Sequence, residues 1–454
     1  MKIYFSGIGG SGVSAIAGFM ADKGHAVIGS DRLFDNRGDH PVKKKIEANN
    51  IRIVPQNGSG LERDCSFAVF STAVEQSNPD YLKAQELGIL IKTRPEYLAE
   101  IVSSYKTIAV AGTSGKSTTS GMLAFLMHRL GMQPNFIGGG RVKQFKTEKN
   151  PGNYLAGNSD LLVIEACESD GSIVNYRPEY SVFLNLDLDH HSVAETGIMF
   201  EKLADNTSGS VLLNADDWNL KLCKIRNAST FSIDKVSDYQ AVDIRYQPLT
   251  TTFSVYGQNI VLSLPGKHNL YNALACIVLL AETGIALKDI AAILPEFSGI
   301  ERRFDIHLND GRHLVIDDYA HNPHKIRSLM QTMQRISEKV CYIFQPHGFG
   351  PTRLMKDGYI SAFIDCLRDT DRFIVLPIYY AGGTAAKDIS SNDLAAPIKA
   401  SGKDALAVID RDTAFTVLGE YDAYVVFGAR DDSLSVLAEG IAQKVKANSA
   451  SSVR

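Results

Sequence analysis

Short apolar runs alternate along the chain with segments of helical periodicity. Many of the runs end at Gly, Asp, Asn or Ser, as strands do where they enter a loop. Ten of them lie at residues 2–9, 25–31, 106–112, 160–166, 180–187, 209–215, 313–319, 339–345, 372–378 and 423–429. Runs this short, separated by segments of helix length, predict βαβ units and largely parallel sheets.

The 454 residues are too many for one ordinary core, and the length predicts about three domains. One boundary is expected at 103–106, where polar residues separate a predicted helix from a new strand. A second is expected at 301–303, after the helical segment 266–282. The predicted α/β domains are therefore 1–104, 105–302 and 303–454, and ligands are expected in the clefts between them.

Composition narrows the class of protein. With 44% hydrophobic and 22% charged residues, and no apolar stretch long enough to span a bilayer, the chain is expected to be cytoplasmic, without a membrane partner. The glycine-rich N-terminus lacks the features of a signal peptide. The small polar residues 447–454 predict a frayed tail.

Charge and cysteine content exclude further classes. A net charge of -4 without a basic stripe argues against nucleic acid as a partner. The six cysteines have no pair at zinc or redox spacing, so they are expected to be reduced and mostly buried.

The first predicted strand runs into a glycine loop, and the second ends at Asp31. The loop has the G-x-G-x-x-G spacing, with the residues Gly7, Gly9, Gly10, Ser11 and Gly12. Glycines let a pyrophosphate approach the backbone at a helix N-terminus, where free N–H groups favour anions. A phosphorylated nucleotide is expected there. One alternative is that the loop is only a structural turn. Another is that the protein is an NAD-dependent oxidoreductase, but that function would leave the second glycine loop, described next, unexplained.

That second loop lies within the strand, loop and helix of residues 107–119. It is a shortened phosphate loop, because Val110 stands where strict spacing requires glycine. Its backbone N–H groups can hold phosphate oxygens, Lys116 can reach the β- and γ-phosphates, and the Ser117 hydroxyl can bind Mg²⁺. A nucleoside triphosphate is therefore predicted as a ligand.

Acidic and imidazole side chains follow the next strands. Glu165 ends one strand, and in a parallel sheet it lies at the same edge as the loop. Asp187, Asp189, His190 and His191 follow another. Such groups suit a Mg²⁺ site beside phosphate oxygens. Each acidic residue taken alone is more often a strand-end cap or a solvated loop residue, and only their convergence on the phosphate loop favours the metal site.

Seven motifs occur in an order that resembles the Mur ligases of peptidoglycan synthesis, over essentially the whole chain. They are GTSGKSTT (112–119), EACESDGS (165–172), NLDLDHH (185–191), NADD (214–217), GKHNLYNAL (266–274), ERRF (301–304) and DDYAHNP (317–323). Within the family, segments 7–17, 71–89 and 168–172 look most like the member that adds L-alanine.

The resemblance implies a Rossmann-like N-terminal domain, a central P-loop ATPase-type parallel sheet and a Rossmann-like C-terminal domain. It assigns the UDP-sugar to Gly7, Gly9, Gly10, Ser11, Gly12, Asp31 and Ser71. It assigns ATP to Gly112, Thr113, Ser114, Gly115, Lys116, Ser117, Thr118, Asn269, Arg303 and Asp318, and metal to Ser117, Glu165 and His190. It implies catalytic roles for Lys116, His190, Arg303 and His347, with ATP and Mg²⁺ as cofactors.

The implied activity is ATP-dependent joining of an amino acid, with L-alanine favoured, to the carboxylate of UDP-N-acetylmuramate through an acyl phosphate. A ligase that recycles murein tripeptide and a non-catalytic UDP-sugar-binding relative are the alternatives. The partners are small molecules, and the chain is expected to be a monomer or homodimer. His347 and His321 are both candidates for the general base.

Three positions depart from the family pattern. Ser114 replaces the usual His or Asn, Cys167 replaces an acid, and Gly348 stands where an arginine is expected. Arginine is the natural bidentate partner of a substrate carboxylate, so Arg353 is the candidate replacement.

Overall fold

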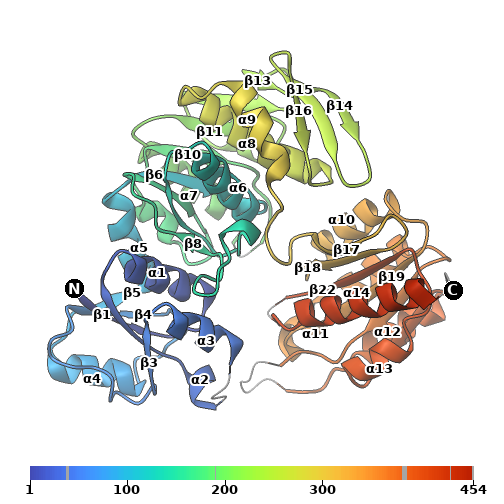
Figure 1. The fold of residues 1–454 in the computed structure, drawn as a ribbon, viewed down its shortest axis with the longest axis horizontal. Coiled ribbons are helices and arrows are strands. Elements are labelled where there is room, and N and C mark those ends of the chain that lie inside the picture. The colour runs from blue at the N-terminus through green and yellow to red at the C-terminus, as the bar shows by residue number, and fades with distance from the viewer. Residues whose placement is uncertain (37–39, 190, 381–385, 430, 452–454) are drawn as a thin grey trace. The chain divides into compact units, whose positions relative to one another are not determined.

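The computed structural model describes residues 1–36, 40–189, 191–380, 386–429 and 431–451 (Figure 1). They form two compact units, Met1–Ile300 and Glu301–Arg454. The first unit holds two parallel-type sheets, and the second unit holds one. Each of the ten apolar runs contains a strand, so the predicted α/β class with largely parallel sheets is confirmed.

The N-terminal sheet has the strand order β3-β2-β1-β4-β5, and all its strands are parallel. Its strands are β1 (Lys2–Ser6), β2 (Ala26–Ser30), β3 (Arg52–Val54), β4 (Phe67–Phe70) and β5 (Ile91–Thr93). Its helices are α1 (Ser11–Asp22), α2 (Arg32–Asn36), α3 (Pro41–Ala48), α4 (Pro79–Leu87) and α5 (Arg94–Ser103). The order reverses beside β1, which places the first glycine loop at a topological switch point.

The central sheet has the order β13-β12-β11-β10-β6-β9-β7-β8, in which only β8 is antiparallel to its neighbour among the described strands. Its strands are β6 (Lys106–Ala111), β7 (Asn135–Ile137), β8 (Tyr154–Leu155), β9 (Leu161–Glu165), β10 (Tyr180–Phe183), β11 (Val211–Asn214), β12 (Ala228–Ser232) and β13 (Tyr239–Gln240). Its helices are α6 (Lys116–Arg129), α7 (Val193–Asp205), α8 (Lys267–Glu282) and α9 (Leu287–Ile293).

A small antiparallel sheet was not expected from the sequence. It is formed by β14 (Val242–Tyr246), β15 (Thr251–Val255) and β16 (Gln258–Leu262). Their apolar runs are at most three residues long, and Phe253, Ile260 and Leu262 join the core that also contains α8. Runs this short do not mark a strand by themselves, so the sequence pattern did not indicate this sheet.

The second unit contains a sheet of order β17-β18-β22-β19-β20-β21, parallel except for β17. Its strands are β17 (Asp305–Asn309), β18 (Leu314–Asp318), β19 (Val340–Gln345), β20 (Arg372–Val375), β21 (Asp404–Ala407) and β22 (Ala423–Gly428). Its helices are α10 (Pro323–Gln334), α11 (Phe349–Cys366), α12 (Asn392–Ala400), α13 (Arg411–Thr416) and α14 (Leu434–Ser451).

Helix α14 corrects the prediction of a frayed tail at 447–454. The helix continues to Ser451, and residues 452–454 lie outside the described part of the chain. Its apolar stripe, which includes Leu437, Ile441 and Val445, packs into the core of the sheet. That stripe anchors the helix, and the alanines that follow favour its continuation.

Within the first unit, the N-terminal and central sheets share one apolar core. The cluster runs from Phe5 and Ile16 to Leu162 and Phe183. Helix α1 contacts β8 closely, because a Cβ on Gly18 would lie 2.4 Å from a ring carbon of Tyr154. The Tyr154 hydroxyl is fixed in turn by the Asn49 amide at 2.7 Å. The two sheets are therefore held together by a tight contact that needs glycine.

Among the described residues, no helix is long and apolar enough to cross a membrane.

Gly18→Ala is expected to destabilise the protein by about 1 to 3 kcal/mol, because the buried Tyr154 ring cannot move aside without losing packing. The midpoint of thermal unfolding measures the effect. Gly197→Ala in α7 is the matched control: its new Cβ would meet Cys223 Sγ at an ordinary 3.4 Å. That variant should be neutral, or more stable by up to about 1 kcal/mol. Equal effects of the two substitutions would contradict the close contact.

Candidate nucleotide and ligase site

The second glycine loop joins β6 to α6 and is framed by Asn185. The Asn185 Oδ1 accepts from the backbone N–H of Ser114 at 2.8 Å, and its Nδ2 donates to the Ser114 carbonyl at 2.9 Å. The Thr113 hydroxyl is bound to the backbone of Asp187. Gly115 has a φ of 88°, and a Cβ there would lie 2.4 Å from Asn272 Oδ1. The loop therefore requires glycine, and Asn185 is a framing residue that the sequence did not single out.

Lys116 is nearly enclosed and is paired with Glu168. Its ammonium donates to the two Glu168 carboxylate oxygens at 2.8 and 3.1 Å, and also to the Gly112 carbonyl. The two side chains are only 13% and 3% exposed, respectively. Glu168 was not predicted as a site residue; its place in the EACESDGS motif was the available signal.

Glu165 lies beside Ser117, as the parallel sheet predicts. Val110 and Glu165 are register partners at the ends of β6 and β9. The Glu165 Oε2 accepts from the Ser117 hydroxyl at 3.1 Å, and its Oε1 accepts from the N–H groups of Gly139 and Gly140 at 2.8 and 3.2 Å. A carboxylate and a hydroxyl oxygen at the mouth of a phosphate loop are the donors that Mg²⁺ prefers. His190, the other predicted ligand, lies outside the described residues.

The first glycine loop brings Asp31 and Ser71 to the start of α1. The Asp31 carboxylate accepts from Gly9 N–H at 2.8 Å and from Leu33 N–H at 2.9 Å. Gly7 has a φ of 83°, and a Cβ there would lie 2.7 Å from Ser71 Cβ. Ser11 and Gly12 open α1, while Gly10 is its N-cap. The predicted UDP-sugar residues are thus gathered in one place.

Asn269 is buried in the first turn of α8. Its Nδ2 donates to the Pro265 carbonyl at 2.8 Å, and its Oδ1 accepts from Asn272 at 3.3 Å. Since Asn272 also borders Gly115, this pair of amides connects α8 to the phosphate loop.

In the second unit, Asp318 holds the loop that carries Arg303. Its carboxylate accepts from the N–H groups of Phe304 and Ala320, each at 2.7 Å. Burial raises the pKa of Asp318. Arg302 and Phe304 both have positive φ values, 57° and 51°, so the backbone on either side of the exposed Arg303 is strained.

Arg302 forms a buried ion pair that the sequence did not reveal. Its Nε lies 3.3 Å from Asp317 Oδ1, and its Nη2 donates to the Gly428 carbonyl at 2.6 Å. Burial raises the pKa of Asp317 to about 7 despite the opposing charge of Arg302. Arg302 and Arg303 both lie over the Tyr319 ring, 5.2 and 5.5 Å from its centroid.

His321 and His347, the two candidate bases, lie together. Their ring centroids are 5.7 Å apart in an edge-to-face arrangement. His321 Nδ1 is 2.9 Å from the Tyr319 carbonyl oxygen. Burial lowers the pKa of His321 to about 4, so this imidazole is neutral at physiological pH.

Gly348 and Arg353 belong to the start of α11. Gly348 is the N-cap, with φ 69° and ψ 131°, and its N–H donates to the Tyr379 carbonyl at 2.8 Å. Arg353 is tied to Asp388 by an ion pair and donates to the Ala386 carbonyl at 3.1 Å. Arg353, the candidate replacement for the missing arginine, thus already has an acidic partner.

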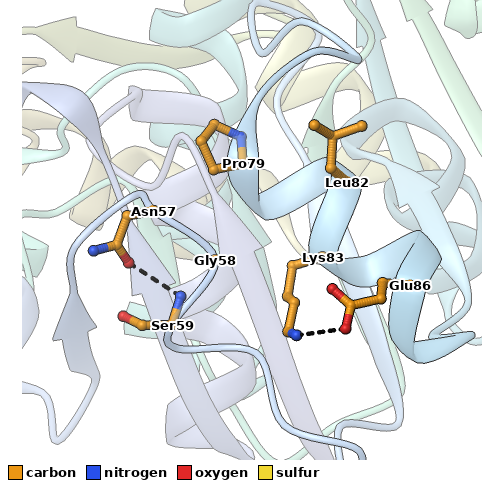
Figure 2. Close-up of a pocket in the computed structure, with 7 residues that line it drawn as sticks. All are labelled: Asn57, Gly58, Ser59, Pro79, Leu82, Lys83 and Glu86. Carbon is orange, nitrogen blue, oxygen red and sulfur yellow. Dashed lines mark hydrogen bonds and ion pairs between the residues drawn. The ribbon is translucent and has the colours of Figure 1, made fainter.

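A separate surface hollow lies in the N-terminal sheet region (Figure 2). It is lined by Asn57, Gly58, Ser59, Pro79, Leu82, Lys83 and Glu86. None of the predicted site residues lines it.

Comparison with known proteins agrees with the fold. Three profiles match the chain: "Mur ligase family, catalytic domain" at 2–106, "Mur ligase middle domain" at 110–280 and "Mur ligase, glutamate ligase domain" at 302–448. The protein named UDP-N-acetylmuramate--L-alanine ligase of Carboxydothermus hydrogenoformans is 32% identical, over 92% of this chain and 90% of its own. The protein of the same name from Persephonella marina is also 32% identical, over 98% and 97%.

Among solved structures, UDP-N-acetylmuramate-alanine ligase from Thermotoga maritima has a TM-score of 0.82 and 27% identity, and covers 99% of this chain and 100% of its own. A murein peptide ligase from Psychrobacter arcticus has a TM-score of 0.69 and 22% identity, with 97% and 99% covered. This second likeness shows the fold alone.

The α/β fold with its four sheets, the glycine loop beside Glu165 and the matching family profiles together define an ATP-dependent ligase. The chain belongs to the Mur ligase family.

The low pKa of His321 predicts a pH dependence of stability. Below the ordinary histidine pKa of about 6.5 the unfolded chain binds a proton that the folded chain does not. The free energy of unfolding should therefore fall as the pH drops from about 6.5 towards 4, and His321→Gln should make this fall shallower. In NMR spectra of ¹³C-labelled histidines, the signal lost in His321→Gln should not titrate between pH 5.5 and 8. Titration of that signal near pH 6.5 would contradict the assignment.

Proposed function

We propose that this ligase joins L-alanine to the lactyl carboxylate of UDP-N-acetylmuramate, with conversion of ATP to ADP and phosphate. The observation that carries the proposal is the pair of glycine loops in one compact unit, one with Asp31 and Ser71 and one with Lys116, Ser117 and Glu165. The names of the curated relatives, 32% identical over nearly their whole length, support the amine and the sugar nucleotide.

The chemistry requires activation of a carboxylate. The γ-phosphoryl group moves to a carboxylate oxygen, which gives an acyl phosphate and ADP; the amine then attacks the carbonyl carbon and phosphate leaves. Lys116 and the loop N–H groups would offset charge on the transferring group. Ser117 and Glu165 would hold Mg²⁺, which supplies further charge compensation on the phosphates when bound. Gly9, Gly10, Ser11 and Gly12 would bind the UDP diphosphate.

The second unit supplies the remaining proposed roles. Arg303 would bind the γ-phosphate, and Asp318 the ribose. His347 would take part in positioning or deprotonating the amine; the low pKa of His321 makes it a weak base and favours His347 for that step. His190 retains its proposed metal and catalytic roles. The division into domains 1–104, 105–302 and 303–454 also stays a proposal.

A ligase for murein tripeptide is the second candidate. Gly348, which leaves an amine site without the expected arginine, favours it. L-Alanine is preferred as the amine because relatives that are 32% identical over most of their length carry that name. We also propose that the enzyme is cytoplasmic and that it is a monomer or homodimer.

The direct test supplies purified protein with ATP, Mg²⁺ and UDP-N-acetylmuramate, and adds L-alanine, other amino acids or the tripeptide one at a time. We expect phosphate release with L-alanine and a product heavier than the sugar nucleotide by one alanyl residue. Phosphate release with tripeptide alone would select the second candidate. Binding of UDP-N-acetylmuramate without release of phosphate by any amine would point to a non-catalytic relative.

Glu165→Gln tests the proposed metal site. Loss of the negative charge should raise the Mg²⁺ concentration needed for half-maximal rate by about 10- to 100-fold. Asp160→Asn is the matched control, because Asp160 precedes the same strand at its opposite end and pairs with the exposed Lys106. Initial rates over a Mg²⁺ series measure both. An unchanged Mg²⁺ dependence in Glu165→Gln would exclude Glu165 from metal binding.

A further inference from the structure

Arg94 lies where the first glycine loop meets the central sheet. It is the first residue of α5, and its side chain borders the first turn of α1: a Cβ on Gly12 would be 3.3 Å from Arg94 Cδ and 3.9 Å from Nη1. Its Nη2 forms an ion pair with Asp170. The two side chains are 22% and 19% exposed, so the guanidinium is held against the helix rather than extended into water.

The polarity of this arrangement is unusual. The N-terminus of a helix carries positive partial charge, which disfavours a cation there. Helix α1 has no acidic residue in its first turn to compensate. At the other end of α1, Lys23 has the favourable polarity and donates to the Gly157 carbonyl at 2.6 Å. Lys23, at the C-terminus of α1, and Arg94, in α5, each contact both α1 and the central domain. Only Arg94 adds positive charge at the N-terminus of α1, where the anion is expected.

Asp170 fixes the direction of the guanidinium. Its Oδ1 accepts from Ser172 N–H at 3.0 Å, which leaves Oδ2 for Arg94. A second contact in the same place comes from Asn153, whose Nδ2 donates to the Ser11 carbonyl at 2.9 Å. The first turn of α1 therefore contacts Arg94, which pairs with the segment after β9, and is bonded to Asn153, which precedes β8.

Asp170 also belongs to the segment that holds Lys116. Glu168, two residues earlier, binds the Lys116 ammonium. The segment 168–170 thus carries two acidic residues: Glu168 binds the lysine of the second glycine loop, and Asp170 binds the arginine beside the first. A guanidinium fork held in this way, beside free helix N–H groups, matches the charge and geometry of a phosphate.

We propose that Arg94 binds the diphosphate of the UDP-sugar and that Asp170 is the positioning residue that aims its guanidinium at the start of α1. The inference rests on the proposed function, since it takes the UDP-sugar as the ligand of the first loop. The proposed Arg94 contact from α5 would add a side chain to the backbone groups of the first loop that bind the diphosphate.

The test compares the parent with Arg94→Ala, Arg94→Lys and Asp170→Asn. Titration calorimetry with UDP and with UDP-N-acetylmuramate is run while a non-hydrolysable ATP analogue fills the second loop. Arg94→Ala should raise the Kd for both ligands by about 10- to 100-fold, as expected for loss of a charged phosphate contact. Arg94→Lys should recover part of the loss, because it restores charge but not the fork. Asp170→Asn should have a smaller effect.

Kinetics separates a binding role from a structural one. Arg94→Ala should raise KM for UDP-N-acetylmuramate and leave KM for ATP within about 2-fold, since Lys116 keeps its own partner. Lys23→Ala is the matched control, because it removes the cation at the opposite end of α1. It should leave both KM values unchanged, whatever its effect on the midpoint of thermal unfolding. In the charge-swapped variant Arg94→Asp/Asp170→Arg the ion pair returns, and UDP affinity should stay low.

Recovery of UDP affinity in the charge-swapped variant would overturn the inference, because the pair would then be structural. Loss of UDP-N-acetylmuramate affinity with unchanged UDP affinity would also overturn it, since the contact would be to the sugar or its carboxylate. Failure of the proposed function has a different signature: the parent itself would bind neither UDP ligand.

Discussion

The charge of Lys116 is the constraint on which the central part of the first unit depends. An ammonium that is only 13% exposed must be compensated, and here Glu168, 3% exposed, provides the opposite charge. The pair fixes the segment after β9 against the phosphate loop. Because the same strand ends in Glu165, one β-strand end supplies a partner both for the lysine and for the Ser117 hydroxyl. When phosphate binds, its negative charge would replace that of Glu168 as the partner of Lys116, and the loop would already be ordered.

The two glycine loops depend on the same shared core. Gly18 lets α1 contact Tyr154, and Asn153, next to it in sequence, holds the start of α1. The sheet that carries the second glycine loop therefore also fixes the position of the first. Under the proposed function the two loops hold ligands that react with each other, and this arrangement helps because a carboxylate and a γ-phosphate must approach within a few ångströms for transfer.

The sequence alone predicted the strands and glycine loops of this site, whose form depends on the backbone. The ten apolar runs became strands, and the glycines marked the loops, because burial and φ preference leave direct traces in residue type. Glu168, Asn185 and Arg302 were not predicted, since their importance lies in partners 52, 71 and 15 residues away. The small sheet β14 to β16 was not predicted for another reason: its apolar runs are at most three residues long, too short to mark a strand by themselves.

Backbone geometry limits which residues can stand at the proposed amine site. Gly348 has φ 69° and ψ 131°, which a residue with a side chain adopts only with strain, so an arginine could not replace it without a change in the loop. Arg353, one turn into α11, already pairs with Asp388. If Arg353 binds the carboxylate of the amino acid, that carboxylate must compete with Asp388. Both side chains of this ion pair are about half exposed, so displacement of Asp388 would cost only about 0 to 1 kcal/mol. The substrate carboxylate would then exchange one anionic partner of Arg353 for another rather than enter an open cationic site.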